Sequence, residues 1–252
     1  MAEPIHQSIR REKLTRAGHF LTGLLEQRGL PVITPSQLFW QVYETYQLGK
    51  NERLYLRNEH PLKPQYDRLR RNLIAAHIIR PDKDYGDRAY YINAIPNLPA
   101  DEITCILDPL CHVSHLSAMQ RWGLTDRAPA FLQLTKPNRG LARIKLQEKT
   151  TQQLHNTQYD SPPIPLTDIS HPKKVRSQPI NIFATASPGA LIKIRGTETR
   201  ISSIEQTFLD TIAKPKMCGG MSHVIQVWKN NFEKYSTTII MEPVSQKLAL
   251  DT

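Results

Sequence analysis

The sequence lacks long apolar runs. No window of its 252 residues approaches the roughly 20 consecutive apolar residues that cross a bilayer. The first residues also contain no apolar stretch of the kind found in a secretory signal peptide. These absences predict a cytoplasmic protein with no membrane partner.

Cysteine is scarce, and its spacing suggests no site. The three cysteines are odd in number and share no C-x-x-C pair, so they predict neither a disulfide framework nor a zinc site. A chain of this length does not need cross-links to fold. We expect all three thiols to be inert core residues in a reducing compartment: Cys105, Cys111 and Cys218.

Positive charge is in excess. The chain has 33 Lys and Arg residues against 23 Asp and Glu, a formal net charge of +10, which favours polyanionic partners such as nucleic acid. With 39% hydrophobic and 22% charged residues, the chain should fold, and its length suggests two domains.

The first helices are predicted by periodicity and capping signals. Apolar side chains at helical spacing within residues 8–28 predict an amphipathic helix that ends near Gly29. Thr34 and Gln37 have the spacing of a capping box, and the proline between them suits a first helical turn. A second helix is therefore expected at Pro35–Tyr46, followed by a polar connection, residues 49–61.

A third helix and a hairpin complete the N-terminal pattern. The helix begins at Lys63-Pro64 and has an apolar stripe that includes Tyr66, Leu69 and Leu73. Short strands at residues 78–79 and 88–92 flank a turn-rich segment. The order helix, helix, helix, hairpin predicts a winged helix-turn-helix domain over residues 1–97, with residues 94–99 as the hinge.

Polar residues opposite the stripe are the candidate DNA contacts. A helix that enters the major groove needs an apolar face docked on its own domain and an opposite face that can contact base edges and phosphates. Arg71 lies opposite the stripe and Arg68 close beside it, whereas Lys63 and Arg70 suit phosphates. The predicted DNA-binding residues are Lys63, Gln65, Arg68, Arg70, Arg71, Asn72 and Arg88.

Two considerations weigh against a larger interface. The helix face is also consistent with an ordinary solvated surface, in which Asp67 pairs with Arg70 or Arg71. The hairpin tip contains three carboxylates, which would repel a phosphate chain, so we expect it to contact DNA little or only through Arg88. The three acids are Asp82, Asp84 and Asp87.

Residues 98–252 contain both the alternating apolar pattern of strands and the helical apolar pattern, which predicts a mixed α/β domain. Together with the N-terminal winged helix, this gives α+β as the predicted fold class. Strands are expected near residues 103–107, 131–135, 180–185 and 191–195. Helices are expected near residues 114–122, 203–213 and 220–232. Residues 150–179 contain five prolines and almost no apolar pattern, which predicts a long surface excursion.

Few residues of the sequence support an enzyme function. Cys111 and His112, with His115 one turn further on, lack a fourth metal ligand at a recognisable spacing. Glu205 suits a capping box with Ser202 or a first-turn acid better than a nuclease site. We therefore predict no catalytic residue, no metal and no cofactor. A nucleic-acid-processing enzyme using Glu198, Glu205 and Asp210 remains an alternative.

Two stretches of the second half resemble the AbiEi family of type IV antitoxins. The first is HVSHLSAMQRWGLTD, residues 112–126. The second is RISSIEQTFLDTIAKP, residues 200–215, followed by a Cys-Gly-Gly triplet, residues 218–220. The latter is similar to the family signature E-x-T-x-x-D, then Pro, then Gly-Gly. Its first three positions are taken here by Glu205, Thr207 and Asp210.

The resemblance implies a function that composition does not. Such proteins join a winged helix to an antitoxin domain, repress their own operon at inverted repeats, and counteract an AbiEii toxin, which resembles a nucleotidyltransferase. The expected partners are thus double-stranded operator DNA and that toxin, and the antitoxin domain is expected at residues 98–252. The alternative is a winged-helix transcriptional regulator whose C-terminal domain senses a ligand or dimerises.

Overall fold

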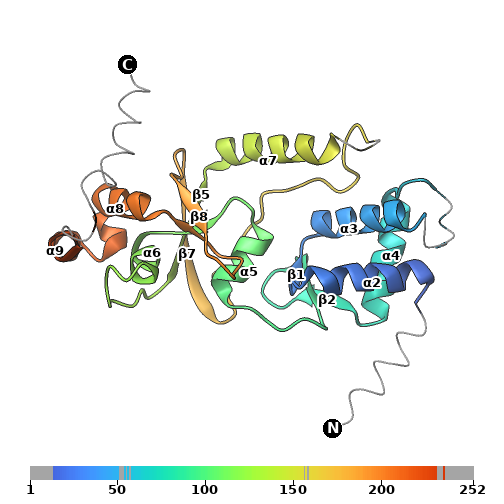
Figure 1. The fold of residues 1–252 in the computed structure, drawn as a ribbon, viewed down its shortest axis with the longest axis horizontal. Helices are drawn as coiled ribbons and strands as arrows, with labels where there is room; N and C mark the ends of the chain where they lie inside the picture. Colours follow the sequence, from blue (N-terminus) through green and yellow to red (C-terminus); the bar gives the residue numbers. More distant parts are fainter. Residues whose placement is uncertain are drawn as a thin grey trace, which may run out of the picture. The chain divides into compact units, whose positions relative to one another are not determined.

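The computed structural model describes residues 14–50, 54, 56, 58–155, 157, 159–231 and 235. Over these residues the protein is a mixed α+β structure with eight α-helices, a three-stranded antiparallel sheet and a six-stranded mixed sheet (Figure 1). It confirms the predicted α+β class. Two compact units share the chain, the first formed by Met1–Pro99 with Arg143–His171 and the second by Ala100–Ala142 with Pro172–Thr252.

Three helices and the small sheet make up most of the first unit. The sheet has the order β1-β3-β2, and both pairings are antiparallel. The elements are α2 (Arg16–Arg28), β1 (Val32–Ile33), α3 (Pro35–Leu48), α4 (Lys63–Ala75), β2 (Ile79–Asp82) and β3 (Gly86–Ile92). The helices lie together, with the sheet at one end of the group (Figure 1).

Capping chemistry explains where the first helices begin and end. Helix α2 ends at Gly29, which has φ of 67°, a left-handed conformation that glycine adopts without strain. At the start of α3, Thr34 Oγ1 accepts from Gln37 N at 3.2 Å and Gln37 Oε1 accepts from Thr34 N at 3.0 Å, so the predicted capping box is confirmed. The predicted start of the first helix, before Leu14, lies outside the described residues.

A single apolar cluster holds the helices and the hairpin together. The apolar stripe of α4 is buried in it through Tyr66, Leu69 and Leu73, as its periodicity predicts. Other fully buried members come from the preceding helices and the sheet: Leu21, Leu25, Ile33, Leu38, Phe39, Val42, Ile79 and Ile92. Burial of this area is the main stabilising contribution in the unit.

The proline-rich segment is more ordered than the sequence predicts. Helix α7 (Arg139–Leu154) covers its start, and β6 (Lys174–Val175) pairs with β7 (Gln178–Thr185) at its end. Between them, the Tyr159 ring lies 5.7 Å from that of Phe39 and 5.3 Å from that of His60, measured between centroids. The sequence did not predict these contacts, because single aromatic and apolar side chains anchor a segment that has no periodic pattern.

The second unit is built on the six-stranded sheet, in the order β6-β7-β5-β4-β9-β8. Strands β5 and β7 are parallel, as are β4 and β9, whereas β8-β9 and β4-β5 are antiparallel. The strands not yet given are β4 (His112–Val113), β5 (Leu132–Pro137), β8 (Leu191–Lys193) and β9 (Arg200–Ser202). The helical elements are α5 (Ala100–Leu107), α6 (His115–Arg121), α8 (Ile204–Ala213), the 3-10 helix η1 (Pro215–Cys218) and α9 (Met221–Asn231).

One predicted strand is in fact a helix. Residues 103–107 were expected to be a strand, but they form the second half of α5. A short apolar run does not distinguish a buried strand from a buried helix by periodicity. Two acids, Asp101 and Glu102, occupy the first turn, where they interact favourably with the helix dipole.

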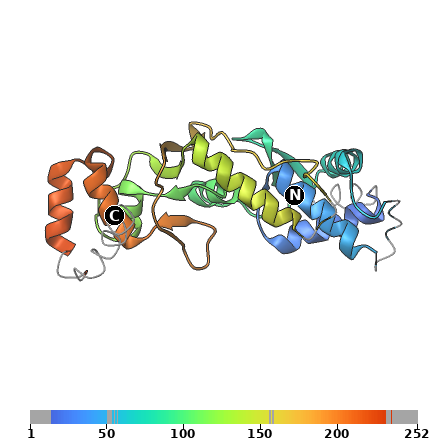
Figure 2. The same cartoon turned by 90° about the horizontal axis from the view of Figure 1, so that it is seen from above.

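The last three helical elements of the second unit share a core with α6. Figure 2 shows α8 and α9 standing together at one end of this unit. Their apolar contacts come from Leu116, Met119, Leu124, Phe208, Cys218, Val224 and Val227. Over the residues described, we find no helix with both the length and the hydropathy required to span a bilayer.

Candidate nucleic-acid interface

Helix α4 presents opposite faces to the core and to solvent. Its start is held by a hydrogen bond from Leu62 N to Gln65 Oε1, 3.2 Å long. Leu69 and Leu73 are buried, whereas Arg68 and Arg71 are exposed. Helical geometry therefore separates the apolar stripe from two cations, as the sequence predicts.

Arg68 and Arg71 keep most of their hydrogen-bonding capacity. Arg71 uses only Nε, which donates to the Asp67 carbonyl oxygen one turn earlier at 3.2 Å. The Arg68 side chain makes no hydrogen bond or ion pair with any residue that the structure describes. A guanidinium has five N–H donors, so both side chains can still donate to a base edge or a phosphate.

Arg70 is held within the unit. Its Nη1 donates to the Tyr90 hydroxyl on β3 at 2.9 Å, and its Nη2 lies 3.6 Å from Asp67 Oδ1. The hydrogen bond with Tyr90 raises the pKa of Arg70 above its ordinary value. The structure thus shows Arg70 joining α4 to the hairpin, and its predicted phosphate contact stays a prediction.

Lys63 and Asp67 form an ion pair on the surface of α4. The Lys63 Nζ to Asp67 Oδ2 distance is 2.8 Å, and the lysine side chain is 64% exposed. Asp67 therefore pairs with Lys63 as well as Arg70, not only with the arginines considered from the sequence. Exposed pairs of this kind contribute little stability, so Lys63 can exchange Asp67 for a phosphate at small cost.

The two amide residues occupy intermediate positions. Gln65 is half-buried, and its oxygen is used to hold the start of α4. Asn72 is also half-buried, and its side-chain amide makes no hydrogen bond with another described residue. Both amides have donors left for a ligand, although each lies nearer the core than Arg71.

Arg88 joins the hairpin to the returning segment of the first unit. Its Nε donates to the Tyr85 carbonyl at 3.0 Å and its Nη1 to the Ser170 carbonyl at 2.6 Å. This second bond could not be predicted from local sequence, because the partner lies 82 residues away. Two of the five N–H donors of Arg88 are therefore used within the fold.

The hairpin tip carries less exposed negative charge than its composition suggests. Asp82 is only 2% exposed, and its Oδ1 accepts from Asp84 N at 2.9 Å and Tyr85 N at 3.2 Å. Arg80, which sequence analysis missed, is exposed, and its guanidinium carbon lies 4.5 Å from the centre of the Tyr91 ring. Arg80 therefore adds a cation to this hairpin that its position between Ile79 and Pro81 did not single out.

The two stretches that carry the family resemblance pack together in the second unit. Trp122 Nε1 donates to the Ser202 carbonyl at 3.0 Å. Arg127, next to the first stretch, donates through Nη1 to the Gly219 carbonyl, also at 3.0 Å. A hollow of about 390 Å³ beside them is lined by residues 123–127 and by polar side chains of α9, including His223 and Gln226.

The suspected catalytic residues have structural contacts. His115 is 2% exposed, and burial lowers its pKa to about 4, with Lys214 as a second cause. Burial likewise raises the pKa of Asp210 to about 6, although hydrogen bonds from Gln206 and Ser202 favour the charged form. Burial therefore keeps His115 neutral at pH 7, whereas it makes the charged form of Asp210 less favourable without preventing its ionisation at that pH.

The helix caps differ in one detail from the prediction. Ser203, not Ser202, caps α8 by accepting from Gln206 N at 3.2 Å. Glu205 is a first-turn acid, as predicted. Glu198 pairs with Lys193 at 2.8 Å. These carboxylates thus act within the fold and do not converge on one point.

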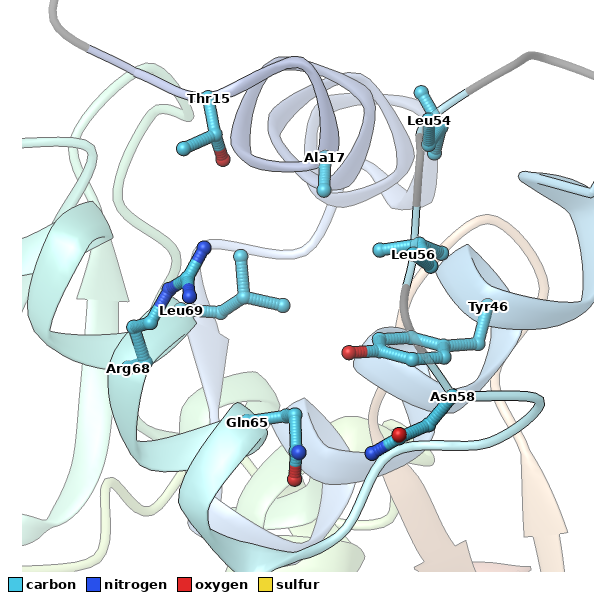
Figure 3. A pocket seen from close by; sticks show the side chains of 9 residues that line it. All are labelled: Thr15, Ala17, Tyr46, Leu54, Leu56, Asn58, Gln65, Arg68 and Leu69. Carbon is cyan, nitrogen blue, oxygen red and sulfur yellow. The ribbon is translucent and has the colours of Figure 1, made fainter.

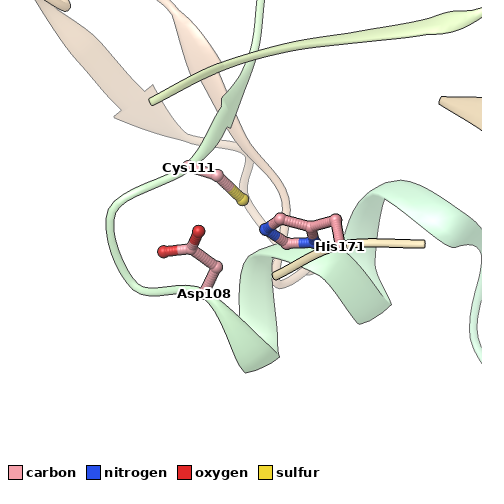
Figure 4. A group of neighbouring side chains, drawn as sticks. All are labelled: Asp108, Cys111 and His171. Carbon is pink, nitrogen blue, oxygen red and sulfur yellow. The ribbon is translucent and has the colours of Figure 1, made fainter. Parts of the chain in front are cut away.

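The cysteines are free and buried, as predicted. Figure 4 shows Asp108 and Cys111 on the loop after α5, where Asp108 Oδ2 lies 3.1 Å from Lys136 Nζ. His171, also drawn there, belongs to the first unit, and its Nδ1 lies 2.9 Å from the Tyr85 hydroxyl. The hydrogen bond with Cys105 and, after it, burial raise the pKa of Cys111, which disfavours a nucleophilic thiolate.

No protein-family model matches the chain, and no curated protein matches it either.

Proposed function

We propose that this protein is a DNA-binding regulator whose first unit is a winged helix-turn-helix, with α4 as the recognition helix. The observation that carries the proposal is the outward face of α4, where Arg68 and Arg71 are exposed with unused donors while the opposite face is buried. Such a helix can lie in the major groove without disturbing its own core.

The arrangement of the elements supports this assignment. Three helices precede a two-stranded hairpin, and the short strand β1 pairs with β3 at the edge of that hairpin. In this proposal α4 lies in the groove, Arg68 and Arg71 contact base edges or phosphates, and Lys63 contacts the backbone. Gln65 and Asn72 support these contacts, while Arg70 and Arg88 hold the hairpin in place.

Duplex binding by the full chain tests the proposal directly. We expect the purified protein to bind DNA from its own promoter more tightly than a scrambled duplex of equal length, with affinity that falls as salt rises. A double variant, Arg68→Ala with Arg71→Ala, should lose this preference. Equal and weak binding of both duplexes at low salt would contradict the proposal.

For the second unit we propose an antitoxin role. It rests on the AbiEi-like residues and is supported by the contacts that join them, Trp122 to Ser202 and Arg127 to Gly219. In this proposal the chain counteracts a nucleotidyltransferase-like toxin and represses the operon that encodes both. The alternative function is a regulator without a toxin partner, which predicts that the chain does not restore growth to cells that express the toxin.

Growth under co-expression separates these two functions. The wild-type chain should restore growth to cells that express the toxin from the adjacent gene. The Arg68→Ala, Arg71→Ala double variant should restore growth as well when both genes are under foreign promoters, because the proposed determinants lie in the second unit. Growth arrest with the wild-type chain would contradict the antitoxin role and leave the regulator as the remaining function.

A further inference from the structure

A hollow in the first unit lies beside the proposed DNA-contacting face. It has a volume of about 350 Å³ and is lined by residues from α2, α3, α4 and the connection between the last two (Figure 3). Its size is at the lower end of the range for small-molecule sites. The polar groups that line it come from different elements, so the fold, and not one stretch of sequence, brings them together.

An almost fully buried tyrosine points its hydroxyl into this hollow. Tyr46 is 5% exposed, and its hydroxyl makes no hydrogen bond with any residue in the described ranges. Figure 3 shows this hydroxyl directed into the open space, with Arg68 on the facing wall. Burial raises the pKa of Tyr46 while the positive charge of Arg68 lowers it, in keeping with two groups that face one space. A buried hydroxyl without a protein partner is an available ligand contact.

Among the described residues, the lining of the hollow carries a positive charge. Arg68 is the charged member of its lining, and no carboxylate among the described residues lines it. Gln65 and Asn58 add two amides at one end. The Gln65 oxygen is already occupied by Leu62 N, so its amide nitrogen remains as a donor. The donors of this lining favour an acceptor-rich anion.

The remaining wall is apolar. Leu54, Leu56 and Leu69 line the hollow together with Ala17. An inorganic ion would leave these side chains in contact with water, whereas a hydrocarbon body would cover them at about 25 cal/mol per Å² of apolar surface buried. The lining therefore favours a molecule with one anionic end and an apolar body.

We propose that this hollow binds a small organic acid, a carboxylate or phosphate monoester with an apolar body, through Arg68 and Tyr46. Resting on the proposed DNA-binding function, we further infer that the bound acid is an effector: it neutralises Arg68 and lowers the affinity for operator DNA. Arg71, on the same helix but outside the lining, keeps its charge exposed.

Calorimetric titration of the full chain tests the site without DNA. The probes are benzoate and phenyl phosphate, with benzamide as the neutral control and inorganic phosphate as the control without an apolar body. We expect saturable binding of one or both acids, and at least roughly tenfold weaker binding of both controls. Which acid binds identifies the anionic group.

Matched variants assign the binding to the hollow. Arg68→Gln should weaken acid binding by roughly tenfold or more and Tyr46→Phe by several-fold, while Arg71→Gln leaves it unchanged. No saturable binding of either acid at about 10 mM would overturn the proposal. Equal losses in Arg68→Gln and Arg71→Gln would overturn it too, because they would indicate attraction to the general positive charge.

A DNA titration then tests the effector role separately. A saturating acid should weaken operator binding by the wild-type chain several-fold and leave the residual binding of Arg68→Gln unchanged. Acid binding that depends on Arg68, in a protein that binds no DNA, would support the site and overturn the effector role together with the proposed function. An equal effect of the acid on wild type and Arg68→Gln would overturn the effector role alone.

Discussion

Four arginines in and around α4 have four different environments. Arg68 has no described partner, Arg71 bonds to a backbone carbonyl of its own helix, and Arg70 bonds to Tyr90. Arg88 reaches a carbonyl 82 residues along the chain. Arg68 and Arg71 are exposed and make no side-chain bond to another element, whereas Arg70 and Arg88 are bonded to residues outside α4 and the turn, which makes the first two the better candidates for contacting a duplex.

Arg71→Ala should weaken operator binding by about 1 to 3 kcal/mol if the side chain contacts a base. Fluorescence anisotropy at one fixed salt concentration measures this loss. Arg195→Ala, which removes an exposed arginine from the second unit, is the matched control for net charge. Equal affinities of Arg71→Ala and wild type would remove Arg71 from the interface.

Arg70 and Tyr90 should be coupled in stability. The hydrogen bond between them involves a charged donor, so we expect a double-mutant cycle of Arg70→Ala and Tyr90→Phe to give a coupling of about 1 kcal/mol in the free energy of unfolding. Urea denaturation provides the four values. Additive effects, with a large loss of DNA affinity in Arg70→Ala, would instead indicate a direct phosphate contact.

Asp210 and His115 should give opposing pH dependences of stability. The pKa of Asp210 is raised to about 6, so its burial weakens folding as pH rises from about 4 to 6. The pKa of His115 is lowered to about 4, so its burial weakens folding as pH falls from about 6.5 to 4. Over their shared window the two effects partly cancel.

Asp210→Asn should expose the histidine effect. The variant removes the opposing titration, so its stability relative to wild type should rise by about 2 kcal/mol between about pH 4.5 and pH 7. Urea midpoints at the two pH values measure the change, with Asp126→Asn as the control on a neighbouring loop. Parallel pH profiles for Asp210→Asn and wild type would contradict the assigned pKa of Asp210.

At the level of elements, the well-predicted segments are those with a local cause. Helices α3 and α4 were located because a capping box, a proline in the first turn and an apolar stripe all lie within the segment. The two-residue strands β1 and β4 were missed because their only support is a partner strand far along the chain. Helix α5 was mistaken for a strand because it is buried almost throughout.

The same limit applies to the candidate site: its local features could be predicted from the sequence, and its long-range contacts could not. Helical periodicity identified the exposed positions of Arg68 and Arg71, because exposure on a helix is a local property. It did not identify the partners of Arg70 and Arg88 or the hollow beneath Arg68, since these depend on segments brought in from elsewhere. Arg80 was missed because its ring partner, Tyr91, lies on the neighbouring strand.

The returning segment should contribute substantially to the stability of the first unit. Tyr159→Ala removes the ring that contacts Phe39 and Tyr43 and should lower the free energy of unfolding by about 2 to 4 kcal/mol. Tyr159→Phe keeps the ring and loses only the hydroxyl bond to the Pro61 carbonyl, so it should lose about 1 kcal/mol. Similar small losses in both variants would show that the ring contacts contribute little.

At the scale of the whole molecule, the chain leaves the first unit and later returns to it, so an N-terminal fragment does not contain the entire unit. The predicted domain of residues 1–97 lacks the segment 143–171, which groups with the first unit. A fragment of residues 1–99 should therefore unfold at a lower urea concentration than the first unit does within the full chain. Circular dichroism of both proteins measures this difference, and coincident transitions would show that the returning segment is dispensable.

The bonds of Tyr85 and Arg88 have a mechanical consequence. These hairpin residues are bonded to His171 and Ser170, and the next residue along the chain begins the second stretch of the other unit. The end of the returning segment is therefore anchored to the hairpin directly before the chain passes into the second unit. Tension along the chain at this crossing would load these two side-chain bonds as well as the backbone.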